Sequence, residues 1–268
     1  MLSAHDVTVE RGGRAVLSSF SIDIAPGEVV VLIGPNGAGK STAFKALSGE
    51  LREVAARVSL DGTPLASLSA AALARRRAVI PQATATAFAF TALEVARLGA
   101  EAGGARARDQ NELAARALGT VGLAGFEARD VTEMSGGEAQ RVHLARALAQ
   151  LAAIAKRGTA TAYLLMDEPT SSLDLQHQIA AMRLARTAAD EGAGVLCILH
   201  DINLAAMAAD RIVALVGGRI IADGRPSLVV TDDLIQRLYG TPISVRGIPA
   251  GDMPFILPQA AGAPSPEL

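Results

Sequence analysis

The sequence predicts an α/β core with an N-terminal antiparallel β subdomain and an inserted α-helical subdomain. Three observations predict this class. Short apolar, β-branched runs alternate with helical patterns through much of the chain. Apolar and polar residues alternate along Leu2–Glu10 and Val16–Ile24, which is typical of an antiparallel pair packed by one face. Between residues 83 and 151, alanine, leucine, arginine and glutamate dominate with the 3.6-residue period of helices.

The first part of the chain supplies the β subdomain and the first half of the core. Pro26-Gly27 marks a turn, and the continuous apolar run that follows it is typical of a buried strand. The expected elements, in order, are a strand at Val29–Ile33, a helix from Ala43 closed by Gly49, a strand at Val58–Leu60 with a hairpin turn at Asp61-Gly62, a helix over Leu65–Arg77 and a strand at Ala78–Ile80.

The helical insertion and the second half of the core follow. We expect helices over Ala92–Leu98, Gln110–Val121 and Glu138–Leu151, with a polar loop at Glu101–Asp109 and a surface link at Ala152–Ala160. The core then resumes with strands at Tyr163–Asp167, Gly194–Leu199 and Arg211–Val216 and with helices over Leu175–Asp190, Ile202–Ala209 and Thr231–Leu238. Proline and glycine enrich the end, where Ile243–Leu257 suggests a small hairpin and Gln259–Leu268 a disordered tail.

These patterns predict one domain over residues 1–268. The α/β core with its β subdomain comprises 1–82 and 160–241, the helical subdomain with its link comprises 83–159, and 242–268 is a C-terminal extension. No internal repeat is evident.

Composition excludes several classes of protein. Net charge is −2 without a dense Lys/Arg stripe, which argues against nucleic acid as the main partner. Arg75–Arg77 is the most basic spot and is more typical of a solvated helix face than of an anion site. No apolar run approaches the roughly 20 residues that cross a bilayer, and the N-terminus lacks a signal-peptide pattern, so we expect a cytoplasmic protein. Cys197 lies in an apolar run and is expected to be a core residue.

The stretch Gly34–Thr42 reads GPNGAGKST and directly follows the Val29–Ile33 strand. It matches G-x-x-x-x-G-K-[ST], the P-loop, in which backbone N–H groups and the next helix's N-terminus surround phosphates. Lys40 would bridge the β- and γ-phosphates, and Ser41 would place its hydroxyl on Mg²⁺. A chance glycine-rich turn would not explain the whole pattern with its flanks. The candidate phosphate-binding residues are Gly34, Pro35, Asn36, Gly37, Ala38, Gly39, Lys40, Ser41 and Thr42. The sequence therefore predicts a P-loop NTPase (RecA-like) core.

Two adjacent carboxylates end the Tyr163–Asp167 strand. Ligands of open α/β sheets bind at the carboxyl ends of the strands, where Asp167 and Glu168 would emerge. Asp167 would coordinate Mg²⁺, and Glu168 would orient or deprotonate the attacking water. Such a pair can also be a solvated turn, but its coincidence with a P-loop favours the catalytic interpretation.

Across nearly its whole length, and in motif order, the chain resembles the ATPase subunits of ATP-binding-cassette (ABC) transporters. The most specific match is MSGGEAQR at residues 134–141, which resembles the family signature LSGGE followed by Q-R. Ser135 is also suited to capping the helix that follows. The resemblance implies that Ser135, Gly136 and Gly137 press on the γ-phosphate of ATP bound to another subunit. Met134 replaces the usual leucine, a volume-conserving change.

Other positions match the family in the same register. Gln82 resembles the glutamine that senses Mg²⁺ and the attacking water. Asp174 ends Ser172-Leu173-Asp174, which resembles the loop that crosses the dimer interface. His200 resembles the switch histidine that contacts the γ-phosphate. The family usually stacks adenine on an aromatic ring where this chain has Arg11. A guanidinium plane can also stack on a base, so Arg11 is the candidate base-binding residue. The resemblance implies ATP and Mg²⁺ as cofactors.

Finer details are similar to importers of iron complexes. Phe88-Ala89-Phe90-Thr91 resembles the segment that receives the permease's coupling helix, although either ring could equally fill the core. Leu175–Gln178 and Leu199–Ala205 resemble haem-import ATPases most closely, with ferric-siderophore and cobalamin ATPases next. The resemblance implies a homodimer bound to two permease copies, indirect work with a periplasmic haem-binding protein, no nucleic acid, and a peripheral location on the cytoplasmic face of the inner membrane.

Two other classes of function are less consistent with the sequence. Soluble ATPases of this superfamily that act on DNA, chromosomes or ribosomes usually add coiled coils, zinc modules or a second cassette, which this sequence lacks. A P-loop kinase or GTPase would not explain Ser135–Gly137, and no N-K-x-D guanine motif is evident.

Overall fold

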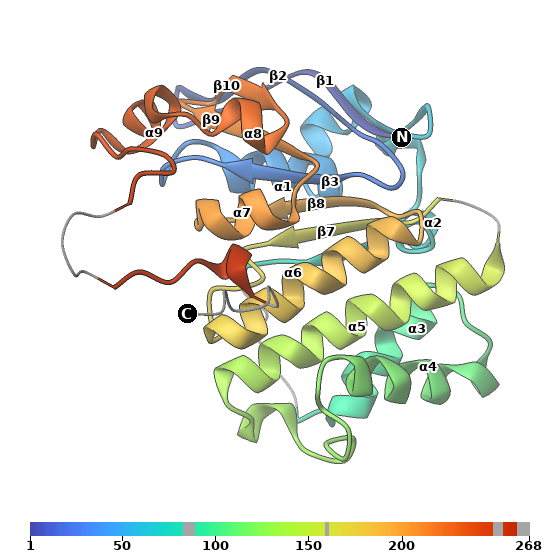
Figure 1. Ribbon diagram of the computed structural model, residues 1–268. Helices are drawn as coiled ribbons and strands as arrows, with labels where there is room; N and C mark the ends of the chain where they lie inside the picture. The colour runs from blue at the N-terminus through green and yellow to red at the C-terminus, as the bar shows by residue number, and fades with distance from the viewer. Residues whose placement is uncertain (83–88, 159–160, 249–253, 262–268) are drawn as a thin grey trace.

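The computed structural model describes residues 1–82, 89–158, 161–248 and 254–261. In the described residues, a six-stranded sheet lies between the antiparallel β subdomain and the helical subdomain (Figure 1). Helix α1 packs between the two sheets, whereas α5, α6 and α7 cover the opposite face of the central sheet. The fold class predicted from the sequence is confirmed.

The antiparallel sheet has the order β2-β1-β4-β5. Its long strands pair through almost their whole length, from Leu2 opposite Ile24 to Arg11 opposite Arg14. Their alternating inward residues, including Leu17 and Phe20, are buried against α1. The strands are β1 (Leu2–Arg11), β2 (Arg14–Ile24), β4 (Val58–Leu60) and β5 (Thr63–Pro64).

The central sheet has the order β10-β9-β3-β8-β7-β6 and is parallel except at β10. Every residue of β3, β7 and β8 is buried, because helices and the β subdomain cover both faces. The strands are β3 (Val29–Ile33), β6 (Arg77–Ile80), β7 (Tyr163–Asp167), β8 (Gly194–Ile198), β9 (Arg211–Val216) and β10 (Arg219–Gly224). Parallel strands bring the residues after β6, β7 and β8 to one edge.

Helices α6, α7 and α9 agree closely with expectation, and Gly49 ends α1 in the left-handed conformation. The helices of the core are α1 (Lys40–Ser48), α2 (Ala70–Ala74), α6 (Leu175–Asp190), α7 (Ile202–Ala208), α8 (Pro226–Val229) and α9 (Asp232–Tyr239). Short 3₁₀ segments occur at Arg52–Arg57, Leu65–Ser67, Val131–Glu133 and Pro258–Ala260. Strand β10 and helix α8 were not predicted.

The predicted helix over Leu65–Arg77 is wrong in extent. Ser69 caps α2 through its side chain, and the helix ends at Ala74. Arg76 lies beyond the helix and forms an ion pair with Asp61, and Arg77 pairs with Tyr163 as the first residue of β6. The three arginines therefore do not form a solvated helix face.

The helical subdomain consists of α3 (Ala92–Ala102), α4 (Ala107–Thr120) and α5 (Gly136–Arg157). Gly99 allows close packing, since a Cβ there would lie 1.9 Å from the Arg146 carbonyl oxygen on α5. Helices α3 and α5 end later than predicted and α4 begins earlier, so residues 101–102 and 107–109 of the expected loop and residues 152–157 of the expected link are helical. Alanine-rich sequence continues the helix, and basic residues in its last turn complement the helix dipole.

The C-terminal extension differs from the expected hairpin and disordered tail. Residues 242–248 and 254–257 contain no strand. Pro258 is buried beside α7, the Gln259 Nε2 donates to Asn203 Oδ1 at 3.2 Å, and Arg183 donates to the Ala261 carbonyl at 3.3 Å. The disorder prediction is thus wrong for residues 259–261, and residues 262–268 lie outside the described part.

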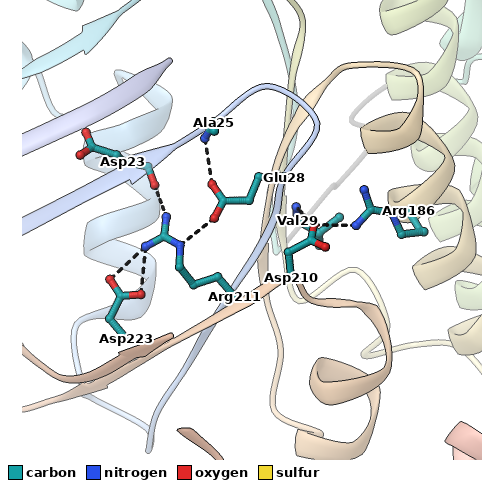
Figure 2. Close-up of polar contacts among 8 residues, drawn as sticks. All are labelled: Asp23, Ala25, Glu28, Val29, Arg186, Asp210, Arg211 and Asp223. Atoms are coloured by element: carbon teal, nitrogen blue, oxygen red, sulfur yellow. Dashed lines mark hydrogen bonds and ion pairs between the residues drawn. The ribbon is translucent and has the colours of Figure 1, made fainter. Parts of the chain in front are cut away.

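A polar network joins the β subdomain to the central sheet (Figure 2). Arg211 on β9 donates to Glu28 at 2.7 Å, to both carboxylate oxygens of Asp223 at 2.9 Å, and to the Asp23 carbonyl. Beside it, Asp210 accepts the Val29 N–H, which begins the P-loop strand, and a guanidinium N–H from Arg186 on α6. One arginine therefore holds β2, the start of β3, and β10 together.

We expect Arg211→Ala to lower the free energy of unfolding by about 2–3 kcal/mol. The substitution would leave the carboxylates of Glu28 and Asp223 without their cation. Because this network is only partly buried, the expected loss is smaller than the roughly 3–5 kcal/mol lost when one partner of a fully buried ion pair is removed. Equilibrium urea unfolding of the whole chain measures the change. Arg219→Ala, at an exposed position at the start of β10, is the control and should stay within about 0.5 kcal/mol. Equal losses in both variants would contradict the role of the network.

Candidate functional site

The P-loop passes between tightly packed backbone segments. Gly34 has φ 155°, and a Cβ there would lie 2.2 Å from the Leu215 carbonyl oxygen. Gly39 has φ 103°, and a Cβ would lie 2.6 Å from the Val16 carbonyl oxygen. Both positions therefore require glycine for conformation and for space. Gly39 also begins α1 without a side-chain cap, which leaves the first N–H groups of the helix available to an anion.

Lys40 is buried beneath this loop. Its Nζ donates to the carbonyl oxygens of Gly34 at 2.8 Å and Pro35 at 3.0 Å. Burial lowers the pKa of Lys40, while the charges of Glu168 and Asp167 raise it. The ammonium is thus positioned by the loop's own carbonyls, and Ser41 follows it on the first turn of α1.

Asp167 ends β7 with its side chain almost fully buried, at 4% exposure. Its Oδ1 has no hydrogen-bond partner among the described residues. Burial first, and the neighbouring Glu168 second, raise the pKa of Asp167 to about 6, against the opposing effect of Lys45 and Lys40. A buried carboxylate oxygen without a partner, next to a P-loop, fits a divalent cation as its missing counter-charge.

Glu168 lies between two other predicted residues. Gln82 Nε2 donates to its Oε2 at 2.8 Å, and His200 Nε2 lies 2.5 Å from its Oε1. Glu168 has φ 51°, a left-handed conformation uncommon for a non-glycine residue, and its N–H donates to Ile198 at 3.2 Å. The three side chains follow β6, β7 and β8, so the parallel order of these strands brings them together.

The start of α5 carries Ser135, Gly136 and Gly137. Ser135 and Glu138 form a capping box, in which Glu138 Oε2 accepts from the Ser135 N–H and hydroxyl, each at 2.8 Å. Ser135 and Gly136 are exposed. Gly137 is close to the next loop, since a Cβ there would lie 3.2 Å from the Ser172 carbonyl oxygen. The structure does not bring these residues to the P-loop of the same chain, because α5 and α1 pack on opposite faces of the central sheet (Figure 1).

Two further predicted residues are held by local partners. Asp174 caps α6, and its Oδ1 accepts the His177 N–H at 2.9 Å and lies 2.7 Å from His177 Nδ1. Arg11 ends β1 with an exposed side chain that donates to Glu53 at 2.5 Å. In the described residues, Arg11 therefore contacts a carboxylate of the β subdomain.

Sequence reasoning missed two residues near the site. His177 contacts the Asp174 carboxylate through its backbone N–H and its ring. An aspartate followed three residues later by a histidine, at the start of a helix, could have predicted this contact. The charge of Lys45 opposes the rise in the pKa of Asp167. Its position four residues after Ser41, on the same face of α1, could have predicted that it lies near the site.

A sequence model of one protein family, described as ABC transporter, matches residues 17–171. The chain belongs to this family. As an ABC transport ATPase, it binds and hydrolyses ATP. Among the described residues, none of the helices is long and apolar enough to cross a membrane.

Named relatives resemble this ABC ATPase over nearly its full length. The hemin import ATP-binding protein HmuV of Rhizobium meliloti (strain 1021) is 47% identical over 97% of this chain and 99% of its own. The protein of the same name from Agrobacterium fabrum (strain C58 / ATCC 33970) is 49% identical with the same coverage.

Solved structures share the fold. A structure described as the ATP-binding subunit of an ABC transporter is 28% identical with a TM-score of 0.73, covering 91% of this chain and 95% of that one. A dimeric ATP-binding cassette bound to ADP and Pi is 25% identical with a TM-score of 0.70, covering 84% of this chain and 99% of that one.

Proposed function

We propose that this ABC ATPase energises haem import through a partner permease at the cytoplasmic face of the inner membrane. The observation that carries the substrate is the set of relatives named for hemin import, at 47% and 49% identity over 97% of the chain. The residues of the site would act on the phosphates of ATP and on water, and none of them is proposed to contact the transported molecule. The choice of haem as the cargo therefore rests on similarity to these relatives.

The P-loop residues and Lys40 would hold the phosphates of ATP. Ser41, Gln82 and Asp167 would hold Mg²⁺, which supplies neutralising charge to the β- and γ-phosphate oxygens. The unpartnered Oδ1 of Asp167 and the uncapped start of α1 support this assignment. Lys40 would then stabilise negative charge on the phosphoryl group during transfer.

Glu168 would orient the attacking water and accept its proton. Its contacts with Gln82 and His200 fix the carboxylate at the edge of the sheet where the γ-phosphate would lie. His200 would also contact the γ-phosphate and stabilise its charge. This three-residue arrangement is the observation that best supports hydrolysis by these particular residues.

The complete active site would need two copies of the chain. Ser135 and Gly136 are exposed, and α5, which begins in the segment Ser135–Gly137, packs on the opposite face of the central sheet from α1. In a head-to-tail homodimer this segment would close the partner's P-loop, with Asp174 at the interface. The dimeric state of a related cassette supports this arrangement. Hydrolysis would then let the dimer reopen and move the docked permeases.

Two permease copies would bind beside α3, with a periplasmic haem-binding protein delivering the cargo. Phe90 is only partly buried and packs against the core cluster, and its carbonyl accepts the Val131 N–H at 2.9 Å. Phe88 lies outside the described residues. Leu98 on α3 is 45% exposed, which supports a partner-facing role for this helix.

Reconstitution tests the substrate. The chain would be purified with its permease in lipid vesicles, and ATP hydrolysis would be followed as haem, a ferric siderophore or cobalamin is delivered by its own binding protein. We expect stimulation and uptake with haem. If only another cargo stimulated ATP hydrolysis, that cargo would replace haem as the proposed substrate, and the chain would still be an ABC transport ATPase.

Arg11 would stack on adenine in place of the usual aromatic ring. We expect Arg11→Ala to weaken ATP binding about 2–5-fold, which corresponds to an exposed cation–π contact of roughly 0.5–1 kcal/mol. Arg11→Tyr should restore it. Inorganic tripolyphosphate is the control ligand, because it lacks a base and should bind all three chains equally. Unchanged ATP affinity in Arg11→Ala would limit Arg11 to its ion pair with Glu53.

A further inference from the structure

A cavity of about 490 Å³ lies at the end of the helical subdomain where α5 finishes. Its lining comes from the connection between α3 and α4, the first turn of α4 and the last turns of α5. Figure 1 shows this connection beside the end of α5. The connection is pressed against α5, since a Cβ at Gly103 would lie 2.5 Å from the Gln150 carbonyl oxygen. Arg157 donates to the Gly104 carbonyl at 3.4 Å. The walls of the cavity are therefore fixed by backbone packing.

Positive charge converges on this cavity. Its lining includes the basic side chains Arg106, Arg108, Lys156 and Arg157. The one carboxylate in the lining, Asp109, lies 3.1 Å from Lys156 Nζ and 3.9 Å from Arg108 Nε, so its charge is already offset. The chain as a whole has a net charge of −2. Four cations against one carboxylate thus stand out against a slightly acidic protein.

The start of α4 adds to this potential. Its N-cap residue is Arg106, whose side chain cannot accept a hydrogen bond, and no side chain among the described residues caps the helix. The helix is 14 residues long, so the positive end of its dipole lies at the cavity. The basic side chains and the start of α4 therefore both favour an anionic ligand.

We propose that this cavity binds a phosphate group, carried either by a soluble phosphate compound or by a lipid headgroup. Phosphate presents several oxygens and more than one negative charge, so it can accept paired hydrogen bonds from a guanidinium fork and contact a second cation at the same time. The volume accommodates a phosphate with its neighbouring atoms. No residue of the ATP site contributes to the cavity, so the site is separate from the nucleotide.

The soluble source is tested with sodium pyrophosphate, followed by the amide NMR signals of Ala107–Asp109. We expect saturable shifts there that weaken with added salt. Pyrophosphate at the P-loop would shift Gly37–Ser41 instead, so the two sites are observed separately. The double variant Arg106→Glu/Arg108→Glu should bind at least tenfold more weakly. Arg97→Glu/Arg116→Glu, which changes charge equally at exposed positions outside the cavity, should bind as the unmodified chain does.

The lipid source is tested by flotation with vesicles of phosphatidylcholine alone or with phosphatidylglycerol. Binding only to the anionic vesicles, lost in Arg106→Glu/Arg108→Glu and kept in the control, would assign the site to lipid phosphate. Pyrophosphate shifts without vesicle binding would assign it to a soluble ligand. If neither probe binds, or if both double variants lose binding equally, the proposal is overturned. ATP hydrolysis is not the readout, so this result is independent of the proposed transport function.

Discussion

Glu168→Gln should bind ATP normally and hydrolyse it at least about 100-fold more slowly, the typical effect of losing one key transition-state group. Glutamine keeps the shape of the side chain and an oxygen for the Gln82 contact, but it cannot accept a proton from water. Steady-state phosphate release measures turnover, and a fluorescent ATP analogue measures binding.

The control is Glu191→Gln, an exposed glutamate after α6 that should change neither quantity. Near-normal hydrolysis by Glu168→Gln would remove Glu168 from its catalytic role. Loss of binding would instead indicate that the carboxylate shapes the nucleotide pocket, since glutamine keeps an oxygen for Gln82 but places an amide nitrogen against His200.

Gly136→Asp should abolish ATP-dependent dimerisation in a Glu168→Gln background. With hydrolysis blocked, we expect ATP to convert the chain from monomer to dimer. An aspartate at residue 136 would place a carboxylate against the partner's γ-phosphate, and like charges in contact at an interface cost several kcal/mol. Light scattering after size-exclusion chromatography, with and without ATP, measures the change.

Within one subunit the same aspartate should be harmless. A Cβ at Gly136 would meet no atom of the described residues within 4 Å, and an acidic residue in the first turn of α5 favours the helix. Gly119→Asp on α4 is the matched control, because a Cβ there is equally unobstructed and the residue is exposed. A Gly136→Asp chain that still dimerises with ATP would refute the shared site.

Local rules predicted the parts of the site that each motif builds by itself. Strand β3, the P-loop and α1 follow one another without a gap, so hydrophobic period and glycine placement were sufficient there. Gln82, Glu168 and His200 could each be placed at a strand end. That their side chains meet depends on β6, β7 and β8 being neighbours in the sheet, which no local pattern states.

The errors have the same origin. The predicted helix ended at Leu151 because a link to the next strand was expected there. No residue near Leu151 stops a helix, however, and α5 continues to Arg157. Gln259 and Ala261 were assigned to a disordered tail because their partners, on α7 and α6 respectively, are distant in sequence. The basic cavity was invisible for a similar reason, since Arg106 and Arg157 are separated by two helices and meet only after packing.

The backbone conformation of Glu168 has an evolutionary consequence. A positive φ costs a non-glycine residue roughly 1–2 kcal/mol, so glycine would suit this position better as far as folding is concerned. With the catalytic role proposed for Glu168, selection for stability and selection for hydrolysis act in opposite directions on this residue. A descendant that no longer hydrolysed ATP would fold more stably with glycine in place of Glu168. A descendant that keeps Glu168 would therefore be expected to hydrolyse ATP still.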